Sequence, residues 1–273
     1  MGFAKYREDI VSRYVSDRHL QKSRRPAART ASAAGQQPAK PKVEEKKMSA
    51  FSKFAVAAAR PLPVIVLADT SGSMSEGGKI QALNAALKDM INAFARETRL
   101  RAEIQVGLIT FGQTARLHLP LAAAQSISTV DDLGAAGKTP LGAALDLARV
   151  LIEDQERIPS RAYRPVLILL SDGLPTDDWK EPFEALCKSE RASKASRFAM
   201  AIGADADEGL LKSFANQPEA PLFKAHNARD IQQFFRAVTM SVAARAASHN
   251  PDLAAAFEMP PASEDDDLDL DFK

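Results

Sequence analysis

Between residues 61 and 248, the sequence alternates between short apolar runs and longer segments whose apolar residues recur every three or four positions. Near-continuous apolar runs are typical of parallel strands covered on both faces, whereas the three-to-four spacing is typical of amphipathic helices. The runs predict strands at residues 62–68, 103–111, 164–171 and 197–203, an antiparallel edge strand at 115–121, and a last short strand at 222–225. This order predicts an α/β fold with a doubly wound, mostly parallel central sheet, one antiparallel edge strand and helices on both faces.

Three of the connecting segments carry the helical spacing. The apolar positions are Ile80, Leu83, Leu87, Met90, Ile91 and Phe94 in the first, Leu141, Leu145, Leu147, Ala148 and Leu151 in the second, and Ile231, Phe234, Phe235, Val238 and Val242 in the third. Repeats at this spacing place the apolar side chains on one face of a helix, so we expect each segment to form a helix.

The ends of the chain differ from this middle part in composition and charge. Residues 1–20 show helical spacing, which predicts either an amphipathic helix that docks on a partner or a frayed, marginal helix. Residues 21–60 have almost no large apolar side chains and predict a basic, disordered linker, whereas residues 249–273 predict an acidic, disordered tail. Residues 1–60 hold 14 Lys and Arg against 5 Asp and Glu, and residues 251–273 hold 1 against 8. Such opposite charges suggest tails that meet partners or each other.

The composition excludes several classes of protein. The single cysteine, Cys187, rules out an internal disulfide framework and any site built from thiolates. The first residues lack the apolar core of a secretory signal, and the longest apolar runs are too short to span a bilayer. We therefore expect a cytoplasmic protein without membrane contact. The basic arm has no interleaved aromatic residues and no recognisable binding fold, which argues against a nucleic-acid partner.

Polar side chains follow two of the predicted central strands and precede one of the predicted helices. The first strand ends in Asp69, Ser71 and Ser73, residues 164–171 are followed by Asp172, and Thr139 precedes the helix near residue 141. Ligands of open parallel sheets bind beyond the carboxyl ends of the strands, so we expect these side chains to converge there. Two carboxylates and three hydroxyls are the oxygen ligands that Mg²⁺ prefers, and Mn²⁺ accepts the same set.

Each of these motifs alone has an ordinary explanation, because an Asp or Ser before a helix usually caps it. A cap needs one oxygen for each helix, whereas here two carboxylates are expected at one sheet edge. Asp177 and Asp178 are interpreted as helix-start acids ahead of residues 179–186. A phosphate-binding loop is excluded because Gly78 and Lys79 stand where that motif needs Lys and Ser or Thr.

The letters DTSGSM, GKTPLG and SDG, in that order, resemble the D-x-S-x-S, Thr and Asp pattern of von Willebrand factor A domains. The resemblance covers about residues 60–248. It implies a metal-ion-dependent adhesion site in which Ser71, Ser73 and Thr139 touch the cation, while Asp69 and Asp172 bind it directly or through water. It also implies that a partner protein completes the metal's coordination with a Glu or Asp.

Two longer segments around these motifs are similar to the bacterial TerY-like branch associated with tellurium resistance: YRPVLILLSDGLPTDDW and GLITFGQTARLHLPL. That branch implies a stress-response or defence system with a protein kinase and a metal-dependent phosphatase as partners. The C-terminal cysteine-rich ribbon that some relatives carry is missing from this sequence, and the basic N-terminal extension lies outside the family pattern.

Our leading hypothesis is a binding module and not an enzyme, and two alternatives from other classes stay open. The same oxygen cluster could serve a Mg²⁺-dependent phosphoester hydrolase. Residues 1–60 could instead make the chain a nucleic-acid-binding adaptor. Within the leading hypothesis, the acidic tail could occupy the metal's open position, although simple solubilisation is the more economical role for it.

Overall fold

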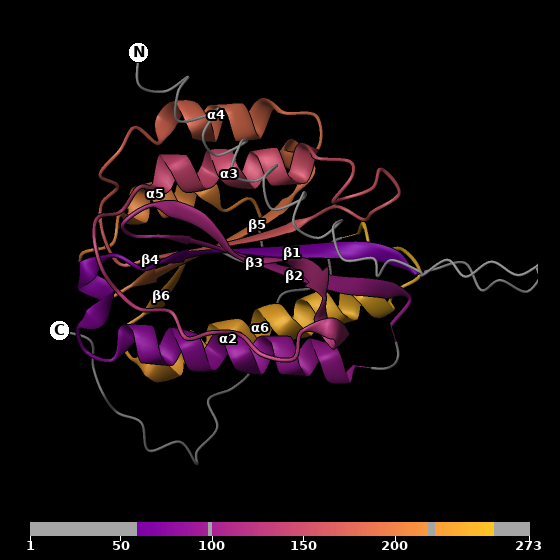
Figure 1. Ribbon diagram of the computed structural model, residues 1–273, viewed down its shortest axis with the longest axis horizontal. Coiled ribbons are helices and arrows are strands. Elements are labelled where there is room, and N and C mark those ends of the chain that lie inside the picture. Colours follow the sequence, from indigo (N-terminus) through magenta and orange to yellow (C-terminus); the bar gives the residue numbers. More distant parts are fainter. Residues whose placement is uncertain (1–58, 98–99, 218–221, 254–273) are drawn as a thin grey trace, which may run out of the picture. The chain divides into compact units, whose positions relative to one another are not determined.

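The computed structural model describes residues 59–97, 100–217 and 222–253. The predicted N-terminal helix (1–20), nearly all of the predicted linker, and the predicted tail beyond residue 253 lie outside the described residues. Helices and strands keep the labels of Figure 1 throughout.

A six-stranded sheet forms the centre of the described part, in the order β3-β2-β1-β4-β5-β6. All neighbouring strands are parallel except β3, which runs antiparallel to β2. This confirms the predicted fold class. The strands are β1 (Arg60–Asp69), β2 (Ala102–Phe111), β3 (Ala115–Ala123), β4 (Val166–Ser171), β5 (Ser196–Ile202) and β6 (Phe223–Ala225).

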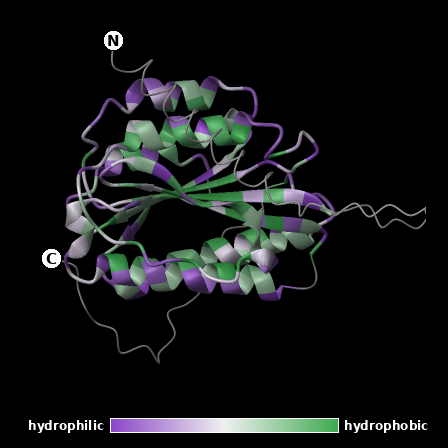
Figure 2. Cartoon of the chain, viewed as in Figure 1, coloured by the Kyte–Doolittle hydropathy of each residue, from purple (hydrophilic) through white to green (hydrophobic). Residues whose placement is uncertain are grey.

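Helices cover both faces of this sheet, as Figure 1 shows. One face carries α2 (Lys79–Arg96) and α6 (Ala228–Ala247), and the other carries α3 (Leu141–Glu153), α4 (Lys180–Lys188) and α5 (Glu208–Phe214). Short 3₁₀ turns lie at Gly72–Ser75, Ala124–Ser126 and Ala192–Lys194. The central strands are mostly apolar, and the helices carry mixed surfaces (Figure 2).

Burial on both faces explains the continuous apolar runs. Every residue of β4 and all but the first residue of β1 are buried. Along β1, Leu62, Val64, Val66 and Ala68 belong to one core cluster with α2 and α6, as the two-residue period of a strand requires. All of the apolar positions that predicted the three long helices are buried in α2, α3 and α6.

The helix α5 has no counterpart in the sequence prediction. It has seven residues, which is too short for a periodic stripe to stand out, and it begins where the Asp207 carboxylate accepts a hydrogen bond from Leu210 N. The fold also extends past the predicted boundary at residue 248. Arg245 is buried and donates from Nε to Pro251 O at 2.9 Å, and Asp252 Oδ1 accepts from Arg164 N at 2.8 Å.

The order of the strands places the point where the connections diverge at the carboxyl ends of β1 and β4. From β1, the chain passes through α2 to β2 on one side; after β3, it returns through α3 on the opposite face to β4 on the other side. The two connections therefore leave the β1–β4 boundary in opposite directions, which is where open α/β sheets bind ligands. Among the described residues, no helix is long and apolar enough to cross a membrane.

Candidate metal centre

Asp69 ends β1 and is completely buried at this edge of the sheet. Its Oδ1 accepts a hydrogen bond from Ser71 N at 2.8 Å, and its Oδ2 accepts from Ser171 Oγ at 2.6 Å. Burial raises the pKa of Asp69 from 3.8 to about 6, with the neighbouring Asp172 carboxylate acting in the same direction and the Ser171 and Ser71 hydrogen bonds opposing it. The site therefore holds a carboxylate in a place that disfavours its negative charge.

Ser71 and Ser73 reach from the β1 loop to Asp172, which follows β4 and is also buried. Ser73 Oγ donates to Asp172 Oδ1 at 2.7 Å, Ser71 Oγ makes a longer contact of 3.4 Å to the same atom, and the two hydroxyls lie 3.1 Å apart. The structure thus brings together Asp69, Ser71, Ser73 and Asp172, which the sequence placed on two separate loops.

Thr139 is buried in the loop that precedes α3. This loop lies against the β1 loop through Ala136 N to Thr70 O (2.8 Å) and Gly72 N to Gly137 O (3.1 Å). Thr139 itself pairs with Thr176 of the β4–α4 loop, since its N donates to Thr176 Oγ1 at 3.1 Å and its O accepts from Thr176 N at 2.9 Å. Thr139 is therefore held by its own hydrogen bonds to the β4–α4 loop, whereas Ala136 and Gly137 of the same segment contact the β1 loop.

Two glycines that the sequence reasoning missed allow these loops to meet. A Cβ on Gly112, just after β2, would lie 2.5 Å from Thr70 O and 2.7 Å from Ala136 O. Gly137 has φ +89°, and a Cβ there would lie 2.7 Å from the backbone of Gln113. Real side chains essentially never approach so closely, so only glycine fits at either position.

Lys79 is a further member of the site that the sequence reasoning missed. Its Nζ donates to Asp172 Oδ2 at 2.9 Å, with side-chain exposures of 6% for Lys79 and 0% for Asp172. The sequence reasoning considered Lys79 only as a failed phosphate-loop lysine. The signal that could have found it is a charged residue directly before the first apolar position of an amphipathic helix.

Asp177 has a different role from the one expected. Its two carboxylate oxygens accept hydrogen bonds from Gly142 N (2.9 Å) and Ala143 N (3.0 Å), which places its charge at the start of α3 and not of α4. Asp178 does lie at the start of α4, where its Oδ1 accepts from Lys180 N at 3.2 Å. The sequence prediction for Asp177 was wrong because it considered only the helix that follows next in the chain.

The residues at this edge fit a divalent cation. They offer two buried carboxylates and the hydroxyls of Ser71, Ser73 and Thr139, all of them hard oxygen donors. Within the described ranges, no group of three or more His, Cys, Asp or Glu residues is arranged to hold a metal. Any metal chemistry at this edge would thus depend on the hydroxyls as well as on the two carboxylates.

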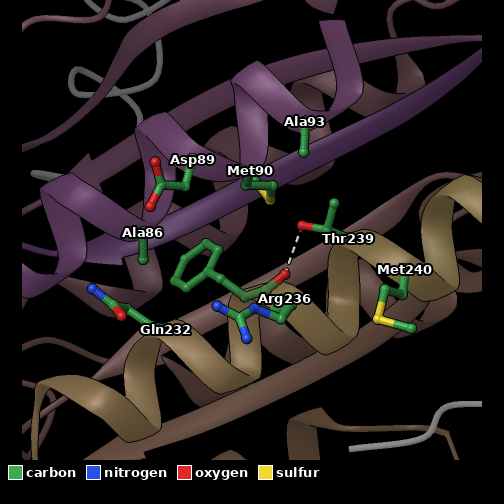
Figure 3. Close-up of a pocket in the computed structure, with 9 residues that line it drawn as sticks. Ala86, Asp89, Met90, Ala93, Gln232, Arg236, Thr239 and Met240 are labelled. Atoms are coloured by element: carbon green, nitrogen blue, oxygen red, sulfur yellow. Dashed lines mark hydrogen bonds between the residues drawn. The ribbon is translucent and has the colours of Figure 1, made fainter. Parts of the chain in front are cut away.

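A cavity of about 400 Å³ lies elsewhere, between α2 and α6. Figure 3 shows Asp89 and Arg236 at its wall, together with the hydrogen bond from Thr239 Oγ1 to Phe235 O (2.6 Å). None of its lining residues belongs to the predicted metal site.

The fold and the order of these motifs are those of a known family, and the chain belongs to it: residues 64–237 match the model of the von Willebrand factor type A domain. One curated relative is the uncharacterised protein Rv2850c of Mycobacterium tuberculosis, 29% identical over 170 residues, which are 59% of this chain and 26% of the relative. The chain covers 12–26% of the length of the curated relatives that it matches.

Solved structures show the same fold. A von Willebrand factor type A protein from Catenulispora acidiphila aligns with a TM-score of 0.51 and 20% identity, over 67% of this chain and 43% of that one. Proximal thread matrix protein 1 from the mussel byssus, in a structure with a zinc-occupied MIDAS motif, aligns with a TM-score of 0.53 and 18% identity, over 67% and 48%.

Proposed function

We propose that this chain is a metal-ion-dependent protein-interaction module that binds an acidic residue of a partner protein. The observation that carries the proposal is the convergence of Asp69, Ser71, Ser73 and Asp172 at the carboxyl ends of β1 and β4, where hydrogen bonds link them across two loops. A structural cap would not require two buried carboxylates at one point.

In this proposal, Asp69, Ser71, Ser73, Thr139 and Asp172 hold Mg²⁺ or Mn²⁺. The mussel protein, whose structure has a zinc-occupied MIDAS motif, supports a divalent cation at this place in the fold. Neutral hydroxyls do not cancel the charge of the metal, so the bound cation stays electrophilic. It would accept one more oxygen, and a Glu or Asp side chain of a partner protein is the natural donor.

We further propose that the chain acts by binding and not by catalysis, in the cytoplasm, within a TerY-like stress-response system. The resemblance of residues 107–121 and 163–179 to that branch supports this setting, and it makes a protein kinase and a metal-dependent phosphatase the partners to test first.

The test is affinity capture of partners by the full chain in Mg²⁺ or in chelator, together with Asp69→Ala. We expect a set of proteins that is retained in Mg²⁺ and lost both in chelator and with the variant. Asp178→Ala is the matched control, because Asp178 is exposed on the β4–α4 loop and bonds only the start of α4. Capture that is equal in all four conditions would contradict the proposal, and turnover of a generic phosphoester by the purified chain would favour the hydrolase alternative.

A further inference from the structure

We propose that Lys79 is a built-in counter-charge of the metal edge: its ammonium group competes with the divalent cation for Asp172 and leaves the loaded site with a net positive charge that selects an anionic partner group. This inference rests on the proposed function, because it concerns the same edge of the sheet. It adds a residue outside the set of oxygen ligands and gives that residue a separate effect on metal affinity and on partner chemistry.

The position of Lys79 goes against two general preferences of proteins. It is the first residue of α2, where the partial positive charge of the helix end disfavours a cation, and its side chain is 6% exposed. Lysine is rarely buried to this extent without a partner. Residues that break such local preferences and are compensated at one specific point are found at functional sites.

The local backbone directs Lys79 into the site. Gly77 and Gly78 both have positive φ, 62° and 81°, so the chain turns sharply and α2 begins at Lys79 without a side-chain cap. On the far side, a Cβ added to Gly203 at the end of β5 would lie 3.5 Å from Lys79 Cε and Nζ. The ammonium group is therefore enclosed between the ends of β4 and β5.

The two oxygens of Asp172 are divided between two kinds of partner. Oδ2 accepts from Lys79 Nζ at 2.9 Å, whereas Oδ1 accepts from Ser73 at 2.7 Å and faces Ser71. Lys79 thus leaves Oδ1 of Asp172, which faces the serine hydroxyls, accessible to a metal cation. At the same time it neutralises part of the negative charge of Asp172 that attracts the cation. A carboxylate shared in this way binds a metal more weakly than one without an ammonium partner.

A count of formal charges gives the consequence for the partner. The carboxylates of Asp69 and Asp172 balance a divalent cation, and Lys79 then leaves the loaded, largely buried site with one positive charge in excess. Such a charge is stabilised by an anionic group from outside, so Lys79 favours a carboxylate over a neutral amide or hydroxyl in the open coordination position.

The test measures Mn²⁺ binding to the full chain at neutral pH from the electron paramagnetic resonance signal of free Mn²⁺. Lys79→Met, which keeps an apolar stem and removes the charge, should bind Mn²⁺ roughly tenfold more tightly or better. Lys138→Met, which removes an exposed lysine beside Thr139, is the control and should stay within about twofold of the wild-type affinity. Acetate should raise the apparent Mn²⁺ affinity of the wild type more than that of Lys79→Met.

Thermal melting keeps the inference testable if Lys79→Met folds poorly. In chelator, Lys79→Met and Lys79→Gln should both melt below the wild type, and saturating Mn²⁺ should raise their melting temperatures more than that of the wild type. If the wild type binds Mn²⁺ and both variants bind it equally or less well, the role of Lys79 is refuted while the proposed function stands. If neither the wild type nor the variants bind Mn²⁺, both are refuted.

Discussion

Among the described residues, charged side chains are buried at Arg197, at Arg245 and at the metal edge, and the last two places stabilise their charges in opposite ways. Arg245 in α6 is buried, and it donates to the carbonyl oxygens of Pro251 (2.9 Å) and Arg164 (3.2 Å) and to Ser196 Oγ (3.4 Å). At the metal edge, the Asp69 and Asp172 carboxylates lie buried near each other, with hydroxyls and one ammonium group around them. Neutral hydrogen-bond acceptors surround the Arg245 guanidinium, whereas the metal edge holds two carboxylates of like charge close together.

Under the proposed function, this difference separates a charge that stabilises the fold from charges that bind a metal. Burial lowers the pKa of the Arg245 guanidinium, yet its hydrogen bonds to fixed carbonyls tie residues 251 and 164 to the end of α6. The pKa of Asp69 is raised to about 6, mainly by burial, which means that the fold does not favour the ionised form that a metal needs. A region that stabilises the fold should respond to mutation in its stability, and a binding region should respond in its affinity for the metal.

The largest effect on stability is expected at Arg245. Arg245→Met removes a buried guanidinium and leaves its carbonyl partners without donors, which should lower the free energy of unfolding by about 3 kcal/mol. Urea denaturation measures this loss, and Mn²⁺ affinity should not change. Arg236→Met, at an exposed position of the same helix, is the control and should leave the urea midpoint in place. If Arg245→Met protein is still folded but no longer binds the metal, the distinction between a stabilising region and a binding region is wrong.

Gly112→Ala should affect both properties, since it lies where three loops of the metal edge meet. A methyl group 2.5 Å from Thr70 O must push the loops apart, at about 2 kcal/mol of stability, and it should weaken Mn²⁺ binding at the same time. Gly134→Ala, where nothing lies within 4 Å of the added carbon, is the matched control. Unchanged Mn²⁺ affinity in Gly112→Ala would show that loop contact does not position the ligands.

Asp69 should make the chain more stable in acid when metal is absent. Its pKa is near 3.8 in the unfolded chain and about 6 in the fold, so the folded state binds the proton more tightly. This contribution is fully present below pH 3.8 and is lost as the pH rises through 6, with a size of about 3 kcal/mol. The stability of the wild type minus that of Asp69→Asn, measured in chelator from pH 4 to 8, isolates it.

The stability of the wild type minus that of Asp69→Asn should fall as the pH rises and should flatten above pH 7. The affinity of the wild type for Mn²⁺ should fall below pH 6. Asp69→Asn should lose Mn²⁺ binding without loss of stability in chelator at pH 7.5, since its amide keeps the shape of the carboxyl and carries no buried charge. A stability difference that rises with pH would contradict the account of Asp69.

The smallest effect is expected for a charge pair that belongs to neither region. Lys188 and Glu184 form a pair on α4 with side-chain exposures of 75% and 66%. Exposed pairs of this spacing contribute little to stability, so Lys188→Met should change neither the urea midpoint nor the Mn²⁺ affinity. A shift in the midpoint comparable to that of Arg245→Met would show that burial does not decide which charges matter.

The strands and the long helices could be predicted because their signals are local. The apolar runs of β1 and β4 are continuous because helices cover both faces, and the stripes of α2, α3 and α6 follow one helix turn after another. The positions of Asp69 and Asp172 were predictable as well, because each directly follows such a run and parallel strands end at one edge.

The remaining parts of the site depend on which loops meet, and this is set by the strand order. Because β2 and β4 flank β1, Gly112 at the end of β2 comes close to Thr70 at the end of β1. The partner of Lys79 lies 93 residues away, and Asp177 caps a helix 35 residues before it in the chain. A local signal can mark one member, as the position of Lys79 before α2 does, but it does not name the partner, because each pair is formed by contacts between distant segments.

The most direct test of the central claim is a Mn²⁺ titration of the full chain after treatment with chelator, followed through the signal of free Mn²⁺. The account predicts that one Mn²⁺ is bound for each chain, that Mg²⁺ displaces it, and that Asp69→Asn and Asp172→Asn abolish binding while Asp178→Asn preserves it. A free-Mn²⁺ signal that rises in proportion to the metal added, with no bound fraction in the wild type, would contradict the account.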